Sequence, residues 1–140
     1  MNYLFTGGSI EIPNSWIDRS VHSFVEDAGD GTAKTSLVIH QVPSQQKLED
    51  FIDQQLVQTA QKLNSYRLHR RRAVRRGFEV SYEWRPSQGT TVHQRQIFVS
   101  RSPHMVTIVT LTTTSSDVAR AESLWAELIT SLRITEEANV

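Results

Sequence analysis

Five histidines are the side chains in this sequence best suited to bind a metal ion or to act as a general base. No two of them have the His-Glu-x-x-His spacing of a zinc protease, and no carboxylate stands at a motif spacing from any of them. Each is expected on a separate strand or turn, where histidines are mostly surface or packing residues. The sequence therefore predicts no metal site at any of these positions, which are His22, His40, His69, His93 and His104.

Other motifs for catalysis are also missing from the sequence. The chain has no cysteine, which excludes thiol catalysis, cysteine-ligated zinc and a disulfide framework. The serines lack the Gly-x-Ser-x-Gly elbow of a hydrolase. The glycines form neither a phosphate-binding loop nor a dinucleotide fingerprint. We therefore expect a protein that is not an enzyme and that needs no cofactor.

A run of arginines is the sharpest charge feature. Residues 67–101 carry nine basic and two acidic side chains, although the whole chain has a net charge of zero and a pI near 7.0. Such a run could neutralise the phosphates of a nucleic acid. On a strand, however, consecutive side chains alternate between faces and cannot all reach one backbone. We therefore interpret the run as a solvated edge of the sheet that pairs with the acidic flanks. The alternative is a nucleic-acid-binding module that uses the arginine-rich strand 67–76. The run comprises Arg67, Arg70, Arg71, Arg72, Arg75 and Arg76.

A strand rich in glutamine is expected from Thr91 to Val99, because β-branched and aromatic residues fill it. On one of its faces Gln94 and Gln96 stand between Val92 and Phe98. Amides within an apolar strip suit a surface that must form hydrogen bonds with an apolar partner. The same mixture recurs on the early strands, where an ordinary half-solvated sheet face would also explain it. These positions are Val21, Ser23 and Val25, then Ser36, Val38 and His40.

The remaining elements follow from periodicity. Apolar residues at three- and four-residue spacing predict a helix that begins after an N-cap at Ser44 and another over Val118–Leu132. Trp16 and Ile17 are expected as core anchors. Alternation predicts the strands, which cover residues 3–5, 9–12, 21–26, 34–41, 66–76, 78–85, 91–99 and 105–113.

This order of elements indicates an α+β fold in a single domain. We expect a curved, mostly antiparallel sheet with the two helices packed on one face and an open groove on the other, an arrangement that antiparallel sheets tolerate. The N-terminus has no basic, apolar signal-peptide pattern, and no stretch approaches 18 apolar residues. The expected location is the cytoplasm.

An ordered set of short pieces resembles the Eag chaperones of type VI secretion, within the DcrB-like, PsbP-related fold group. The resemblance covers the chain from about Tyr3 to Ile134. The matching pieces are Ile12-Pro-Asn-Ser-Trp16, Ser36-Leu-Val-Ile39, Phe51-Ile-Asp-Gln-Gln-Leu56, Tyr82-Glu-Trp84, His93-Gln-Arg-Gln-Ile-Phe98 and Thr110-Leu-Thr-Thr-Thr114.

The resemblance implies that residues 1–140 form a single DcrB-like chaperone domain, usually dimeric, without catalysis or cofactor. Such a chaperone would bind and shield the N-terminal transmembrane helices of a PAAR or Rhs effector and help to load it on the secretion spike. Ser23 departs from the family pattern, in which an aliphatic residue is expected, but a small residue there would let a helix approach closely. The residues implied to bind the effector helix are Val21, Ser23, Val38, Gln55 and Gln96.

Overall fold

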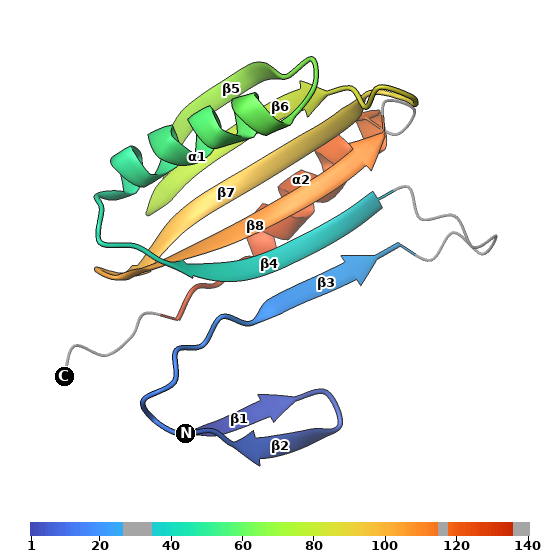
Figure 1. Ribbon diagram of the computed structural model, residues 1–140. Coiled ribbons are helices and arrows are strands. Elements are labelled where there is room, and N and C mark those ends of the chain that lie inside the picture. Colours follow the sequence, from blue (N-terminus) through green and yellow to red (C-terminus); the bar gives the residue numbers. More distant parts are fainter. Residues whose placement is uncertain (27–34, 115–117, 136–140) are drawn as a thin grey trace.

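One six-stranded antiparallel sheet with a helix on each face forms the main body of the computed structural model (Figure 1). The structure describes residues 1–26, 35–114 and 118–135. A hairpin of β1 (Asn2–Phe5) and β2 (Gly8–Glu11) precedes the main sheet. The helices are α1 (Leu48–Lys62) and α2 (Val118–Ser131). The strands of the main sheet are β3 (Val21–Val25), β4 (Thr35–Pro43), β5 (Arg67–Val74), β6 (Gly77–Trp84), β7 (Val92–Ser102) and β8 (Met105–Thr114).

The main sheet has the strand order β3-β4-β8-β7-β6-β5, and every neighbouring pair is antiparallel. The predicted α+β class and the antiparallel sheet are therefore confirmed. The predicted glutamine strand begins one residue later and ends three residues later than expected, because β7 continues to Ser102 through an irregularity in its pairing with β8. β3 and β5 are the two edges of the sheet.

Helix α1 packs on one face of the sheet. Its buried Phe51 and Ile52 contact an apolar cluster that includes Val80 on β6, Phe98 on β7 and Ile108 on β8. The rings of Phe51 and Phe98 meet edge to face, with centroids 6.3 Å apart. Figure 1 shows α1 in front of the β5–β6 side of the sheet, so that β3 and β4 lie beyond it.

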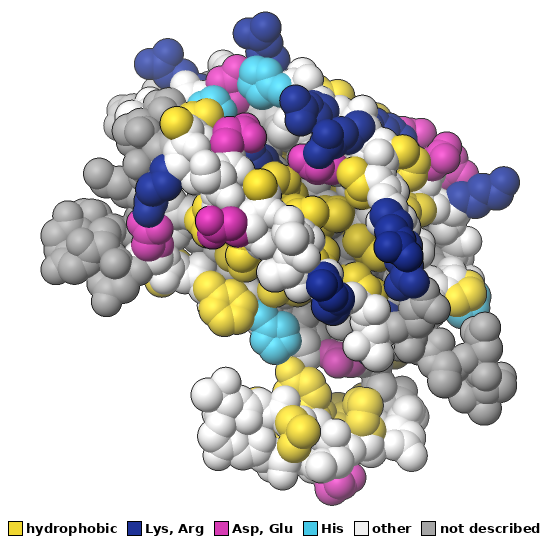
Figure 2. All heavy atoms as spheres, turned by 180° about the vertical axis from the view of Figure 1, so that it is seen from behind, with side chains coloured by type: hydrophobic (Ala, Val, Ile, Leu, Met, Phe, Trp, Pro, Cys, Tyr) yellow, Lys and Arg dark blue, Asp and Glu magenta, His cyan; other side chains and the backbone are white. Residues whose placement is uncertain are grey.

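Helix α2 packs on the opposite face, and the prediction that both helices share one face is wrong. Ala121 and Trp125 of α2 are buried against Ile97, Val99 and other residues whose side chains point away from α1. The sequence carried a signal for this arrangement, because the consecutive residues 97–99 are all apolar and all buried, as expected for a strand covered on both sides. Apolar side chains occupy the middle of the α2 face in Figure 2.

A buried carboxylate joins the second helix to the sheet. Glu79 on β6 is only 6% exposed. Its side chain accepts hydrogen bonds from the indole Nε1 of Trp125 at 3.1 Å and from Nη2 of Arg72 on β5 at 2.8 Å. These bonds satisfy a charge that would be costly to bury alone. Glu79 thereby links α2, which packs on β7 and β8, to the neighbouring strand β6.

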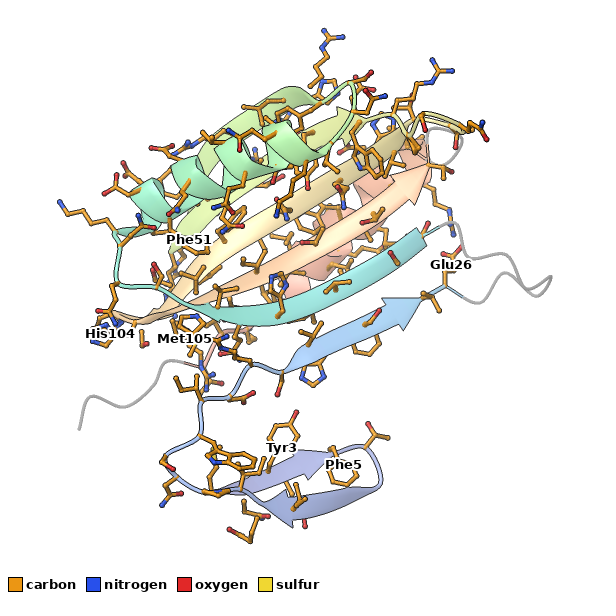
Figure 3. The ribbon with its side chains drawn as sticks, in the orientation of Figure 1. Tyr3, Phe5, Glu26, Phe51, His104 and Met105 are labelled. Carbon is orange, nitrogen blue, oxygen red and sulfur yellow. The ribbon has the colours of Figure 1, made fainter. Side chains whose placement is uncertain are left out.

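The N-terminal hairpin lies apart from the main sheet, and β1 and β2 pair only with each other within the described residues. In Figure 3 the side chain of Tyr3 points from the hairpin toward the main sheet, and its hydroxyl accepts a hydrogen bond from Ser20 Oγ at 3.0 Å. Trp16 and Ile17 are 66% and 63% exposed, so their predicted role as core anchors is wrong. Their apolar character alone suggested a core position, but they stand in the connection between the hairpin and β3.

The first helix begins later than predicted. Its N-cap residue is Lys47, which makes no capping hydrogen bond with its side chain. Ser44, the predicted N-cap, instead accepts a hydrogen bond from the backbone N–H of Gln46 at 3.1 Å. This short turn connects the end of β4 to the helix and brings α1 over the sheet face that β4 shares with β7.

Candidate functional site: an open sheet face beside α1

Four of the five residues expected to bind a helix point to the same side of the sheet. Paired residues of an antiparallel ladder share a face, and the register links Ser23, Val38, Thr110 and Gln96 in one row across β3, β4, β8 and β7. This is the side on which α1 packs, because Gln96 has the same parity as Phe98. We call the part of this side beyond α1 the open face. It consists of Val21, Ser23, Val25, Ser36, Val38, His40, Gln94, Gln96, Thr110 and Thr112.

The fifth residue, Gln55, lies on the sheet-facing side of α1 and is half-buried. An ion pair with Arg71 of β5 places Asp53 on the edge of α1 nearest β5. Gln55 is two residues, or about 200°, further around the helix, and it is four residues from Phe51, which packs on β7. The structure therefore brings Gln55 to the border between α1 and the open face.

Two glutamine–threonine pairs give the open face its polar character. Gln96 Nε2 donates to Thr110 Oγ1 at 3.1 Å, and Gln94 Nε2 donates to Thr112 Oγ1 at 3.0 Å. Each bond uses one of the two N–H groups of the amide and leaves the amide oxygen and the other N–H available for further bonds. The pairs hold both glutamines against β8, so that their amides form a fixed row of donors and acceptors.

His40 is the titratable side chain at the middle of the open face. It lies between Val21 and Ile108 in the next row of the ladder. Burial lowers the pKa of His40 and so favours its neutral imidazole. Its Nδ1 is buried without a hydrogen-bond partner among the described residues. A buried polar atom of this kind costs free energy unless a ligand bonds to it, which makes it a candidate contact for a bound partner.

The outer edge of the open face is apolar and exposed. Val21 and Val25 of β3 are 63% and 65% exposed, and Phe24 on the other side of this strand is 56% exposed. β3 is also a free edge of the main sheet within the described residues. Large apolar side chains exposed beside polar groups are typical of an interaction site.

The arginine run does not form one basic surface. Arg71 pairs with Asp53 of α1 on one side of the sheet and lies 5.6 Å from the centre of the Phe78 ring. Arg72 pairs with Glu79 on the other side. The predicted alternation between faces is confirmed for these two arginines. The predicted pairing with an acidic flank is confirmed for Arg71, whereas the partner of Arg72 lies within the basic segment itself. The geometry gives no support to the alternative of a nucleic-acid-binding strand.

The structure also brings together three side chains that sequence reasoning kept apart. His69 on β5, Glu83 on β6 and His93 on β7 have their ligand-type atoms within 4.8 Å of one another. They lie on the side of the sheet opposite the open face, because Glu83 pairs with His93, which has the parity of Ile97. The spacing gave no motif, and only the register of the β6–β7 hairpin could have indicated that Glu83 and His93 are neighbours.

Comparison with known proteins identifies the family of this fold. The sequence model of the DcrB family matches residues 7–131. The chain belongs to the DcrB family. A curated relative, Effector EagT6 of Pseudomonas aeruginosa, is 29% identical over 136 residues, which are 93% of each chain. The resemblance to DcrB-like Eag proteins predicted from the sequence is thereby confirmed.

A solved structure shares this architecture from end to end. The crystal structure of a Pseudomonas aeruginosa protein of unknown function superimposes with a TM-score of 0.79 and 27% identity, and the match covers 100% of this chain and 98% of that one. Among the described residues, no helix is both long enough and apolar enough to cross a membrane.

Proposed function

We propose that this DcrB-family protein is a chaperone for a type VI secretion effector, and that residues 1–140 act as one chaperone domain. Its client would be a PAAR or Rhs effector with N-terminal transmembrane helices, which the protein binds, shields from water and helps to load on the secretion spike. The observation that carries the proposal is the open face, where apolar and hydrogen-bonding side chains alternate beside α1. The end-to-end similarity to Effector EagT6 supports it.

The dimensions of the open face suit a membrane-spanning helix. β4 has nine residues, which corresponds to a length of about 30 Å at roughly 3.3 Å per residue. The hydrocarbon core of a bilayer, and hence the apolar part of a spanning helix, is also about 30 Å. A helix lying along β4 and β8 would contact Val38 at its middle, with Gln55 of α1 and Ser23 of β3 on its two sides.

The mixed chemistry of this face matches the problem that such a client poses. A spanning helix in water exposes on the order of 1,000 Å² of apolar surface, so its burial provides a gross driving force of tens of kcal/mol. The entropy lost when the two partners associate and the desolvation of polar groups offset much of that driving force. A purely apolar face would itself aggregate when empty. Amides and hydroxyls beside valines keep the empty protein in solution, and they can bond to Ser, Thr or backbone groups of the helix as polar residues do between transmembrane helices. The process requires neither catalysis nor a cofactor.

A homodimer in the cytoplasm is part of the proposal. The N-terminal region presents Leu4, Phe5 and Trp16 at 73%, 53% and 66% exposure, although such side chains are usually buried. A second copy of the chain would cover this apolar surface. Light scattering on the purified protein tests the dimer separately. A monomeric protein would contradict the dimer but not the proposed binding of a helix to the open face.

Capture of the tagged protein from its native cells, with mass spectrometry of the bound proteins, tests the function. We expect a stoichiometric partner that has an N-terminal apolar segment. Val38→Gln would place an amide at the centre of the contact and should weaken capture by roughly 5- to 150-fold, equivalent to about 1–3 kcal/mol. Val57→Gln is the matched control, because Val57 is 57% exposed on α1. Recovery of nucleic acid alone, or equal capture by both variants, would contradict the proposal.

A further inference from the structure

We propose that His69, Glu83 and His93 bind a divalent transition-metal ion of the zinc type. Two imidazole nitrogens and one carboxylate oxygen lie within 4.8 Å of one another. Two histidines and a glutamate are a donor set that zinc uses where three protein ligands leave a fourth position open. The site would be independent of the helix-binding surface, because it occupies the other side of the sheet.

Three adjacent strands hold the three side chains in place. Glu83 of β6 and His93 of β7 are direct partners in the ladder. His69 stands at the irregularity where the pairing of β5 with β6 shifts between Leu68 and Arg70. A bulge of this kind redirects a side chain, and bulges are over-represented beside functional sites. The ladder thus holds Glu83 and His93 side by side, and the irregularity places His69 next to them, which favours a preorganised site.

The local distances fit a site that closes around an ion. His69 Nε2 lies 2.9 Å from Glu83 Oε1, at hydrogen-bonding distance. The rings of His69 and His93 are stacked with centroids 6.4 Å apart and an angle of 17° between their planes. Ligand atoms about 2.1 Å from a tetrahedral zinc ion are roughly 3.4 Å from one another. Small side-chain rotations would bring the three atoms to that separation, with the metal lying between them.

A cavity of about 320 Å³ adjoins the cluster and extends to the start of α2. It leaves room for water or an anionic ligand at the fourth position. Arg95 also lines it, but its guanidinium forms an ion pair with Glu122 of α2. Arg70 lines the same cavity, and its positive charge opposes a bound cation. Histidine, acidic and basic side chains gather at the upper edge of this face in Figure 2.

Zinc titration of the full chain, freed of metal with a chelator, tests the site by calorimetry. We expect binding of one zinc ion per chain. His69→Ala and His93→Gln should each weaken it by more than the roughly 10- to 100-fold that changes to outer-shell partners cost. His22→Ala is the matched control, because His22 is an exposed histidine on β3. Unchanged affinity in the first two variants, or equal loss in all three, would overturn the proposal.

Two further measurements separate a metal site from a simple ion pair between strands. Cobalt bound to the wild-type chain should give the visible absorption of a four-coordinate ion, and Glu83→Gln should remove it. Arg70→Gln should tighten zinc binding, because it removes a repulsive charge. A cross-strand ion pair alone predicts no cobalt spectrum and no effect of Arg70, and either result would refute the site. Failure here leaves client capture untouched, so the two proposals are tested separately.

Discussion

Replacement of Glu79 by leucine should destabilise the fold by about 3 kcal/mol. Glu79 is 6% exposed and accepts hydrogen bonds from Trp125 of α2 and from Arg72 of β5. In the leucine variant the indole N–H would remain buried without an acceptor, because Trp125 is itself only 5% exposed. The guanidinium of Arg72 can turn to water, since its side chain is 56% exposed.

The magnitude follows from these two unequal contacts. A hydrogen bond to a charged group contributes about 1.5–3 kcal/mol, and a stranded buried donor costs a similar amount. The pair with Arg72 is discounted to about 1 kcal/mol or less, because one partner is largely solvated. Domains of this kind are stable by about 5–15 kcal/mol, so the variant should fold with a clearly lower midpoint.

Urea unfolding of a double-mutant cycle measures the contact itself. Trp125→Phe removes the indole N–H, and its cost should shrink by at least about 1.5 kcal/mol in the Glu79→Leu background. Glu127→Leu on the exposed side of α2 is the control and should change the free energy of unfolding by less than about 0.5 kcal/mol. A coupling below about 0.5 kcal/mol would refute the conclusion that Glu79 links α2 to β6.

Three further predictions concern the open face and the sheet beneath it. Gln96→Ala should lower the free energy of unfolding by only about 0.5–1.5 kcal/mol, because one hydrogen bond to Thr110 is lost. The same variant should also weaken client capture. Unchanged capture by this folded variant would count against a role of the glutamine amides in binding. Gly77→Ala should prevent stable folding, since a Cβ there would lie 2.0 Å from the carbonyl oxygen of Phe98, and a soluble variant with the wild-type melting temperature would contradict this contact. Because burial lowers the pKa of His40, the unfolded chain binds a proton more readily than the folded one, so stability is fully present above the ordinary pKa of about 6.5 and falls as the pH drops below it. His40→Leu should reduce this loss of stability at acid pH, measured by urea unfolding at a series of pH values. The same pH dependence of stability in the variant and the wild type would show that His40 does not cause the loss.

The sequence was sufficient to predict the helices and strands, and to predict which side chains of each central strand lie on the same face. Alternation along Phe78–Trp84 and the glutamine strand predicted correctly which side chains share a face. The grouping of Val38 with Gln96 came instead from the family resemblance, and the register across β8 places both side chains on the same face. A period of two is a direct consequence of strand geometry, so this kind of inference transfers well from sequence to structure.

Which helix covers which face could not be derived in the same way, although the apolar run 97–99 indicated that both faces of the strand are covered. Each helix has one apolar stripe, and such a stripe fits either face of the sheet. Trp16 and Ile17 show the related limit, because hydrophobicity alone does not distinguish a core residue from one on an exposed connection. The cluster of His69, Glu83 and His93 depends on long-range register and a bulge, which local spacing does not encode.

The central claim is that the open face binds an apolar helix, and site-specific photo-crosslinking tests it most directly. A photoreactive residue at Ser23 would lie on the open face, whereas the same residue at Val57 would face solvent on α1. After irradiation in the native cells, we predict that position 23 is crosslinked to the N-terminal apolar segment of an effector, and that position 57 is not. Crosslinks of equal yield at both positions, or crosslinks from position 23 only to segments without an apolar helix, would contradict the account.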